Sequence, residues 1–180
     1  MDAITFTASK QQALPMKRLL GAFCLAGCTA ALLIVGVSPA CGATLSRSVD
    51  VKGAPSAVWS MIGPFCAIAD WHPAIGSCTT DGKARPTRTL VTKDGMATFV
   101  ELQTARSDAK HRYSYTFESS PVPVTGYTST IQVVGKSRGV STVTWSSAYS
   151  PNPGKEKDAR ETLSGIYESG LAEIKAKLAR

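Results

Sequence analysis

The chain has 180 residues, of which 43% are hydrophobic and 18% are charged, and its formal net charge is +7. This length and composition suit one globular domain and leave little room for a second. The basic residues do not cluster with interleaved aromatic residues, so the sequence does not predict nucleic-acid binding.

The N-terminal part of the chain has the layout of a secretory signal. Lys17 and Arg18 precede an apolar run over residues 19–37, and small residues follow that run. This order of basic, apolar and small residues predicts cleavage between Ala40 and Thr44.

We therefore expect residues 1–43 to be a signal peptide and residues 44–180 to form a periplasmic or secreted domain. Translation could begin at Met1 or at Met16. Two alternatives stay open, and either would tie the protein to a membrane. The apolar run approaches the about 20 residues that span a bilayer, so it could remain as an anchor, and Cys28 follows a lipoprotein-like sequence.

One strand and two short helices are expected after the signal. Residues 45–51 alternate in the manner of a half-buried strand. Pro55 suits the first turn of a helix, which needs no amide donor there, and Gly63-Pro64 ends that helix. A second short helix is expected over residues 65–70, before a bend at Trp71-His72-Pro73.

The rest of the chain predicts an antiparallel meander and one long helix. Six further strands are expected between turn-forming residues, at 75–80, 87–93, 96–105, 112–119, 128–134 and 141–149. From Glu156 to Arg180 the apolar residues recur every 3.6 positions, which predicts an amphipathic helix. The expected fold class is α+β, with about seven strands in a curved antiparallel sheet wrapped around the C-terminal helix.

Three small residues interrupt the predicted C-terminal helix. Gly165, Ser169 and Gly170 are poor helix formers, and each glycine costs about 1 kcal/mol relative to alanine. They could leave room for a cavity between helix and sheet, or they could permit close packing. We expect the cavity, because a glycine inside an element usually has a packing or functional reason.

Cys66 and Cys78 flank the bend at Trp71-His72-Pro73. In an oxidising compartment such a pair could form a disulfide. Two buried free thiols, acting as small apolar groups, are the alternative. The sequence alone does not decide between them, because the distance between the two residues is unknown.

His72 could line a pocket, act as a general acid or base, or be structural. The chain has only two histidines, and no cluster of cysteines or carboxylates accompanies His72, so no metal site is predicted.

Arg88 and Glu101 lie on neighbouring predicted strands and could pair across them. Each shares a strand face with apolar residues, so we expect both to point inward, and an exposed ion pair is the alternative.

Four aromatic residues with polar tips could line the same pocket, or simply fill the core: Trp71, Tyr115, Tyr127 and Trp145. The chain contains no nucleophile elbow, dinucleotide-binding glycine motif or phosphate loop. Whether the protein is an enzyme therefore stays open, and the sequence favours a protein that is not one.

Several motifs occur in a specific order along the chain: Ala54–Phe65, Trp71-His72-Pro73, Arg88-Thr89-Leu90, Asp94-Gly95, Glu101-Leu102, Tyr113-Ser114-Tyr115, Pro121–Val124, Tyr127 and Val143–Ser146. Together they resemble the SRPBCC superfamily of START-like helix-grip proteins, in particular its polyketide cyclase/dehydrase and lipid transport group. The chain also resembles a secreted branch that includes accessory proteins encoded beside bacterial methanol dehydrogenases.

This resemblance implies a cavity between sheet and helix that holds a small hydrophobic or amphipathic molecule, without a cofactor. A first alternative is a periplasmic accessory protein that binds a redox enzyme such as a dehydrogenase. A second alternative is an enzyme similar to polyketide cyclases and dehydratases, which would need a positioned acid or base. Fold alone does not choose among these three functions.

Overall fold

The computed structural model describes residues 42–180. The predicted apolar signal run, the two candidate start residues and Cys28 lie outside the described residues. Of the predicted cleavage zone between Ala40 and Thr44, residues 42–44 are described, and Ala43 is the first residue of a strand. No helix within residues 42–180 is long and apolar enough to cross a membrane.

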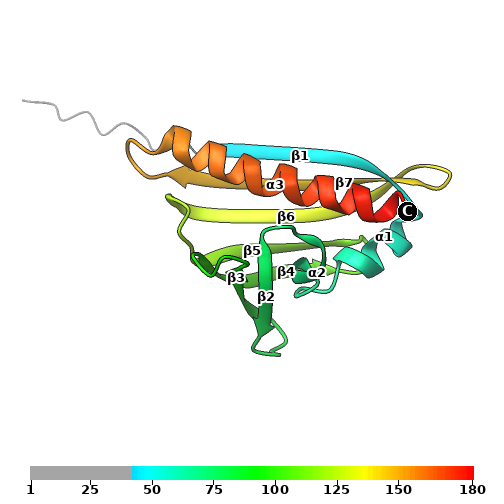
Figure 1. Cartoon of the computed structure of the whole chain (residues 1–180), viewed down its shortest axis with the longest axis horizontal. Coiled ribbons are helices and arrows are strands. Elements are labelled where there is room, and N and C mark those ends of the chain that lie inside the picture. The colour runs from blue at the N-terminus through cyan, green and yellow to red at the C-terminus, as the bar shows by residue number, and fades with distance from the viewer. Residues whose placement is uncertain (1–41) are drawn as a thin grey trace, which may run out of the picture. The chain divides into compact units, whose positions relative to one another are not determined.

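The sheet has seven strands, all paired antiparallel, in the spatial order β1-β7-β6-β5-β4-β3-β2. In chain order they span Ala43–Lys52 (β1), Ile75–Thr80 (β2), Thr87–Thr92 (β3), Thr98–Ser107 (β4), Arg112–Ser119 (β5), Val124–Ser137 (β6) and Val140–Pro151 (β7). The sheet is curved, so β2 at one edge runs across the direction of β1 at the other (Figure 1).

Three helices complete the fold. Two short helices, α1 (Pro55–Ile62) and α2 (Ile68–Trp71), lie between β1 and β2 in the chain. The long helix α3 (Glu156–Leu178) packs against β1, β7 and α2 (Figure 1). The α+β helix-grip architecture predicted from the sequence is therefore confirmed.

Most elements lie within about two residues of their predicted bounds, and two, α2 and β6, differ by more. The helix expected from Phe65 begins only at Ile68, because residues 64–67 form a turn in which Ala67 N–H donates to Pro64 O. Strand β6 starts at Val124 rather than near Thr128, since a bulge continues the pairing with β7 past Gly126. The turn-forming residues that the sequence shows there mark an irregularity inside a strand.

The small residues of α3 do not form the floor of a cavity, so that expectation was wrong. A Cβ atom on Gly170 would lie 2.7 Å from His72 Cδ2, 3.0 Å from the Trp145 ring and 3.1 Å from the Trp71 ring. Gly165 is exposed, and a Cβ atom there would meet nothing within 4 Å. Gly170 therefore permits close packing of the helix on two indole rings.

Cys66 and Cys78 form a disulfide, which is one of the two alternatives left open by the sequence. The bond joins the turn before α2 to strand β2, across 12 residues of sequence. It fixes the segment that carries His72 to the edge of the sheet, so the bend cannot move independently of β2.

The two glycines of α3 provide a matched test of the packing. We expect Gly165→Ala to raise the free energy of unfolding by up to about 1 kcal/mol, because alanine is the better helix former. Gly170→Ala should lower it by about 1–2 kcal/mol, since overpacking against His72, Trp71 and Trp145 outweighs that gain. Urea unfolding of both variants measures the difference, and an equal stabilisation at both positions would contradict close packing at Gly170.

Candidate ligand-binding site

A cavity of about 80 Å³ lies between the sheet and the helical segments. We call it the central cavity. Its walls are mainly apolar and come from α2, strands β2 to β7 and α3, with Ile68, Ile75, Leu90, Phe99, Phe117 and Ile166 among the lining residues. This volume suits several water molecules or a ligand body of about one six-membered ring.

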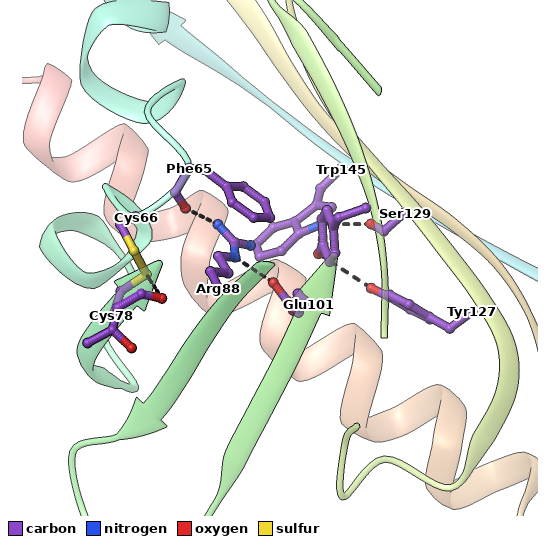
Figure 2. A network of polar contacts seen from close by, with 10 residues as sticks. Phe65, Cys66, Cys78, Arg88, Glu101, Tyr127, Ser129 and Trp145 are labelled. Atoms are coloured by element: carbon purple, nitrogen blue, oxygen red, sulfur yellow. Dashed lines mark hydrogen bonds and ion pairs between the residues drawn. A yellow bond between two sulfur atoms is a disulfide. The ribbon is translucent and has the colours of Figure 1, made fainter. Parts of the chain in front are cut away.

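Arg88 and Glu101 form an ion pair beside the central cavity (Figure 2). They are direct cross-strand partners on β3 and β4, and Arg88 Nε donates to Glu101 Oε2 at 2.6 Å. Arg88 is 0% exposed and Glu101 is 4% exposed. Both side chains therefore lie inside the fold, but only Glu101 lines the cavity, with Arg88 behind it.

Phe65 supplies two further contacts of the buried guanidinium, beside the Tyr115 ring at 5.2 Å and the Tyr113 ring at 5.8 Å from Arg88 Cζ. Arg88 Nη1 donates to the Phe65 carbonyl oxygen, and Arg88 Cζ lies 4.1 Å from the centre of the Phe65 ring (Figure 2). A cation placed over an aromatic face is stabilised by the ring quadrupole. The turn before α2 thus closes over the charge from the side opposite Glu101.

Burial and ion pairing shift the pKa values of Arg88 and Glu101 in opposite directions. Burial alone would lower the pKa of Arg88, but the Glu101 carboxylate raises that pKa above its ordinary value. Burial raises the pKa of Glu101, and the charge of Arg88 opposes that rise. Arg88 therefore stays a cation and is the permanent counter-ion of Glu101.

His72 lines the central cavity, but both of its ring nitrogens are already engaged. The Ala74 N–H donates to His72 Nδ1 at 3.2 Å, and His72 Nε2 lies 3.0 Å from the carbonyl oxygen of Ile166. Because an N–H can only donate and a carbonyl can only accept, the ring is the neutral tautomer with hydrogen on Nε2. Burial, with help from Arg88, lowers the pKa of His72. The geometry therefore assigns His72 a structural role on the cavity wall.

A hydroxyl network adjoins the central cavity and includes the lining residues Tyr115, Tyr127 and Trp145. Trp145 Nε1 donates to Tyr115 Oη at 3.0 Å and to Ser129 Oγ at 3.1 Å. Tyr127 Oη lies 2.6 Å from Tyr167 Oη, which lies 3.1 Å from Ser129 Oγ. Burial raises the pKa of Tyr115, Tyr127 and Tyr167, so the phenols are neutral donors.

Of the aromatic residues expected in the site, Tyr115, Tyr127 and Trp145 line the cavity and Trp71 does not. Trp71 is buried against Trp145, with ring centres 5.7 Å apart, on the side where Gly170 packs.

Sequence reasoning missed Ser129 and Tyr167, which complete the hydroxyl network. Tyr167 belongs to the apolar stripe of α3. Its hydroxyl group was the feature of the sequence that could have predicted a hydrogen bond inside the fold. On β6, Ser129 lies two residues from Tyr127 and two from Ile131, so all three side chains share the inward face.

A metal centre is not indicated in the part of the chain that the structure describes. Among residues 42–180, no three histidine, cysteine, aspartate or glutamate side chains are grouped so that they could hold a metal ion. The side chains with polar atoms that line the cavity are His72, Thr92, Glu101, Tyr115, Tyr127 and Trp145.

Residues 42–179 match the sequence profile of the family described as polyketide cyclase/dehydrase and lipid transport. The chain belongs to this family. The predicted SRPBCC membership is thereby confirmed, and the fold of solved family structures agrees with it. No curated protein sequence matches the chain significantly.

Several solved structures share this family's fold with the chain. XoxI from Bacillus cereus is 33% identical, with a TM-score of 0.72, and the match covers 76% of this chain and 96% of XoxI. An uncharacterised protein from Bacillus thuringiensis is 32% identical, with a TM-score of 0.72, and the match covers 77% of this chain and 100% of that one. The Zhui aromatase/cyclase from Streptomyces sp. R1128 is 14% identical, with a TM-score of 0.62 over 77% and 94% of the two chains, and so shows the fold alone.

Removal of one partner of the buried ion pair should be costly. We expect Arg88→Met and Glu101→Leu each to lower the free energy of unfolding by about 3–5 kcal/mol, because each leaves the other group buried and unpaired. The double variant should lose less than the sum of the two, by about 1–3 kcal/mol.

Denaturant unfolding of all three variants measures this coupling. Arg47→Met is the control, because Arg47 pairs with Glu168 at the surface, where side-chain exposures are 34% and 58%. An exposed pair of this kind contributes at most about 1 kcal/mol. Strict additivity of the Arg88 and Glu101 effects would contradict a coupled buried pair.

The neutral state of His72 predicts a pH dependence of stability. The pKa of His72 is lowered in the folded protein, so below the ordinary value of about 6.5 the unfolded chain binds more protons. The stabilisation that depends on neutral His72 is therefore fully present above about pH 6.5 and is lost as the pH falls toward the pKa of His72 in the folded protein. Over this range the free energy of unfolding should fall by up to about 1.4 kcal/mol per pH unit.

Unfolding at several pH values between 7.5 and 5 measures this slope. In His72→Gln the slope should shrink, because the titrating group is gone. His111→Asn is the control, since His111 has a φ of 46° and asparagine tolerates this left-handed conformation. Equal slopes in the wild type and His72→Gln would refute the assignment.

Proposed function

We propose that this protein is exported and binds one small hydrophobic or amphipathic molecule in the central cavity. The observation that carries the proposal is the combination of apolar walls with a few convergent polar groups, Glu101, Tyr115 and Tyr127, on one side. Ligand pockets commonly have this composition, in which apolar surface provides affinity and polar groups fix orientation.

The size of the cavity favours binding over polyketide cyclisation. Pockets for drug-sized ligands measure about 300–1,000 Å³, whereas the central cavity measures about 80 Å³. A polyketide chain would need the walls to move apart. His72 is not available as a general base, because Ala74 N–H and the Ile166 carbonyl engage both of its ring nitrogens.

Two features support export. The N-terminal sequence has the layout of a cleavable signal. The disulfide between Cys66 and Cys78 is the kind of bond that persists in oxidising compartments such as the periplasm.

An accessory protein for a periplasmic redox enzyme is the second candidate. It is supported by the 33% identity to XoxI over nearly the whole of that protein and by the resemblance to accessory proteins encoded beside methanol dehydrogenases. In that case the binding surface for the enzyme would matter more than the cavity.

Native mass spectrometry and solvent extraction of the protein, purified gently from the periplasm of its own host, test the proposal. We expect one small molecule per chain, released by organic solvent. Ile166→Phe should abolish it, because Ile166 lines the cavity, whereas Val134→Phe should retain it, because Val134 is 52% exposed on β6. An empty wild-type protein that co-purifies with a redox enzyme would overturn the proposal in favour of the accessory role.

A further inference from the structure

The direction of each hydrogen bond in the hydroxyl network follows from the backbone. Ser129 Oγ donates to the Ser146 carbonyl oxygen at 3.0 Å, so its only hydrogen is used there. Tyr167 must therefore donate to Ser129, and Tyr127 must donate to Tyr167. The three donor–acceptor distances are 3.0 Å for Ser129, 3.1 Å for Tyr167 and 2.6 Å for Tyr127, which lie within or close to the usual range for hydroxyl hydrogen bonds.

Tyr115 is the exception in this network. Its oxygen accepts from Trp145 Nε1, so its own hydrogen needs an acceptor. The Tyr127 hydroxyl oxygen lies 3.5 Å away, beyond the usual range of about 2.5–3.0 Å for O–H···O, and the one hydrogen of Ser129 is already donated to the Ser146 carbonyl oxygen. Tyr115 is 2% exposed and lines the central cavity, so a free donor faces a buried space.

Glu101 presents the complementary acceptor on the same wall. Its Oε2 accepts from Arg88, while Oε1 accepts no hydrogen bond from the residues that the structure describes. Tyr115 on β5 pairs with Gln103, two residues from Glu101 on the same face of β4. The free donor and the free acceptor are therefore diagonal neighbours in a largely apolar cavity.

The charge of the site restricts what can use these two groups. Arg88 already neutralises Glu101, so a cationic or anionic ligand would bring an uncompensated charge into a buried space. A hydroxyl group can accept from Tyr115 and donate to Glu101 at once without adding charge. A water molecule could do the same, and a ligand hydroxyl that replaces it keeps both hydrogen bonds.

We propose that the central cavity selects a neutral molecule with one hydroxyl group, held between Tyr115 and Glu101, and an apolar body of about one ring. The body lies against Leu90, Phe99 and Phe117, which line the cavity. This inference rests on the proposed small-molecule binding and specifies the class of ligand.

Phenol and toluene are matched probes, because they differ by a hydroxyl in place of a methyl group. Their dissociation constants for the mature protein can be measured by NMR chemical-shift titration. We expect phenol to bind about tenfold more tightly than toluene, as one or two hydrogen bonds would give. Tyr115→Phe should reduce the ratio to near one, while its fold is preserved because Trp145 keeps Ser129 as an acceptor.

Tyr149→Phe is the matched control, since Tyr149 is buried on β7 but does not line the central cavity. It should retain the tenfold ratio. Equal binding of phenol and toluene would overturn the hydroxyl inference while small-molecule binding stands. A preference for phenol that persists in Tyr115→Phe would also overturn it, and failure of both probes to bind would overturn the inference together with the cavity as a site for ring-sized ligands.

Discussion

The guanidinium of Arg88 lies fully buried between the Glu101 carboxylate and Phe65, and several kcal/mol of desolvation must be offset for it to stay there. The compensating contacts come from strand β4, from the turn before α2 and from strand β5, whose Tyr115 ring centre lies 5.2 Å from Arg88 Cζ. These segments must hold their positions for the charge to be tolerated. The same contacts orient Glu101 from behind, so the polar wall of the cavity depends on a residue that does not line it.

Close packing at one end of α3 explains where the cavity can form. Gly170 lets the helix approach the Trp71 and Trp145 rings, and His72 is tied to the carbonyl oxygen of Ile166. Directly at Gly170 the helix and the two indole rings leave no room even for a methyl group. Leu163 and Ile166, farther toward the N-terminus of α3, line the cavity instead. The bend at His72 thus sets the depth at which the helix sits on the sheet.

The sequence predicts the parts of this arrangement that depend on periodicity. Strand alternation placed Arg88 and Glu101 on the inward face, and the 3.6-residue period identified α3. It could not distinguish a void from close packing at Gly170, because both require a small residue. It also could not place Trp71 outside the cavity or find Ser129, since alternation defines a face but not the neighbours across the sheet.

The histidine and the tyrosines around the cavity are held in their neutral states, and Glu101 faces a counter-ion. His72 is fixed as a neutral tautomer by two backbone groups, burial raises the pKa of Tyr115 and Tyr127, and Glu101 has a permanent counter-ion in Arg88. Proton transfer to a bound molecule would break at least one of these arrangements. A fixed pattern of donors and acceptors instead discriminates among ligands by leaving a mismatched one with unpaired polar groups, which is costly in an apolar space. The geometry therefore favours recognition over turnover.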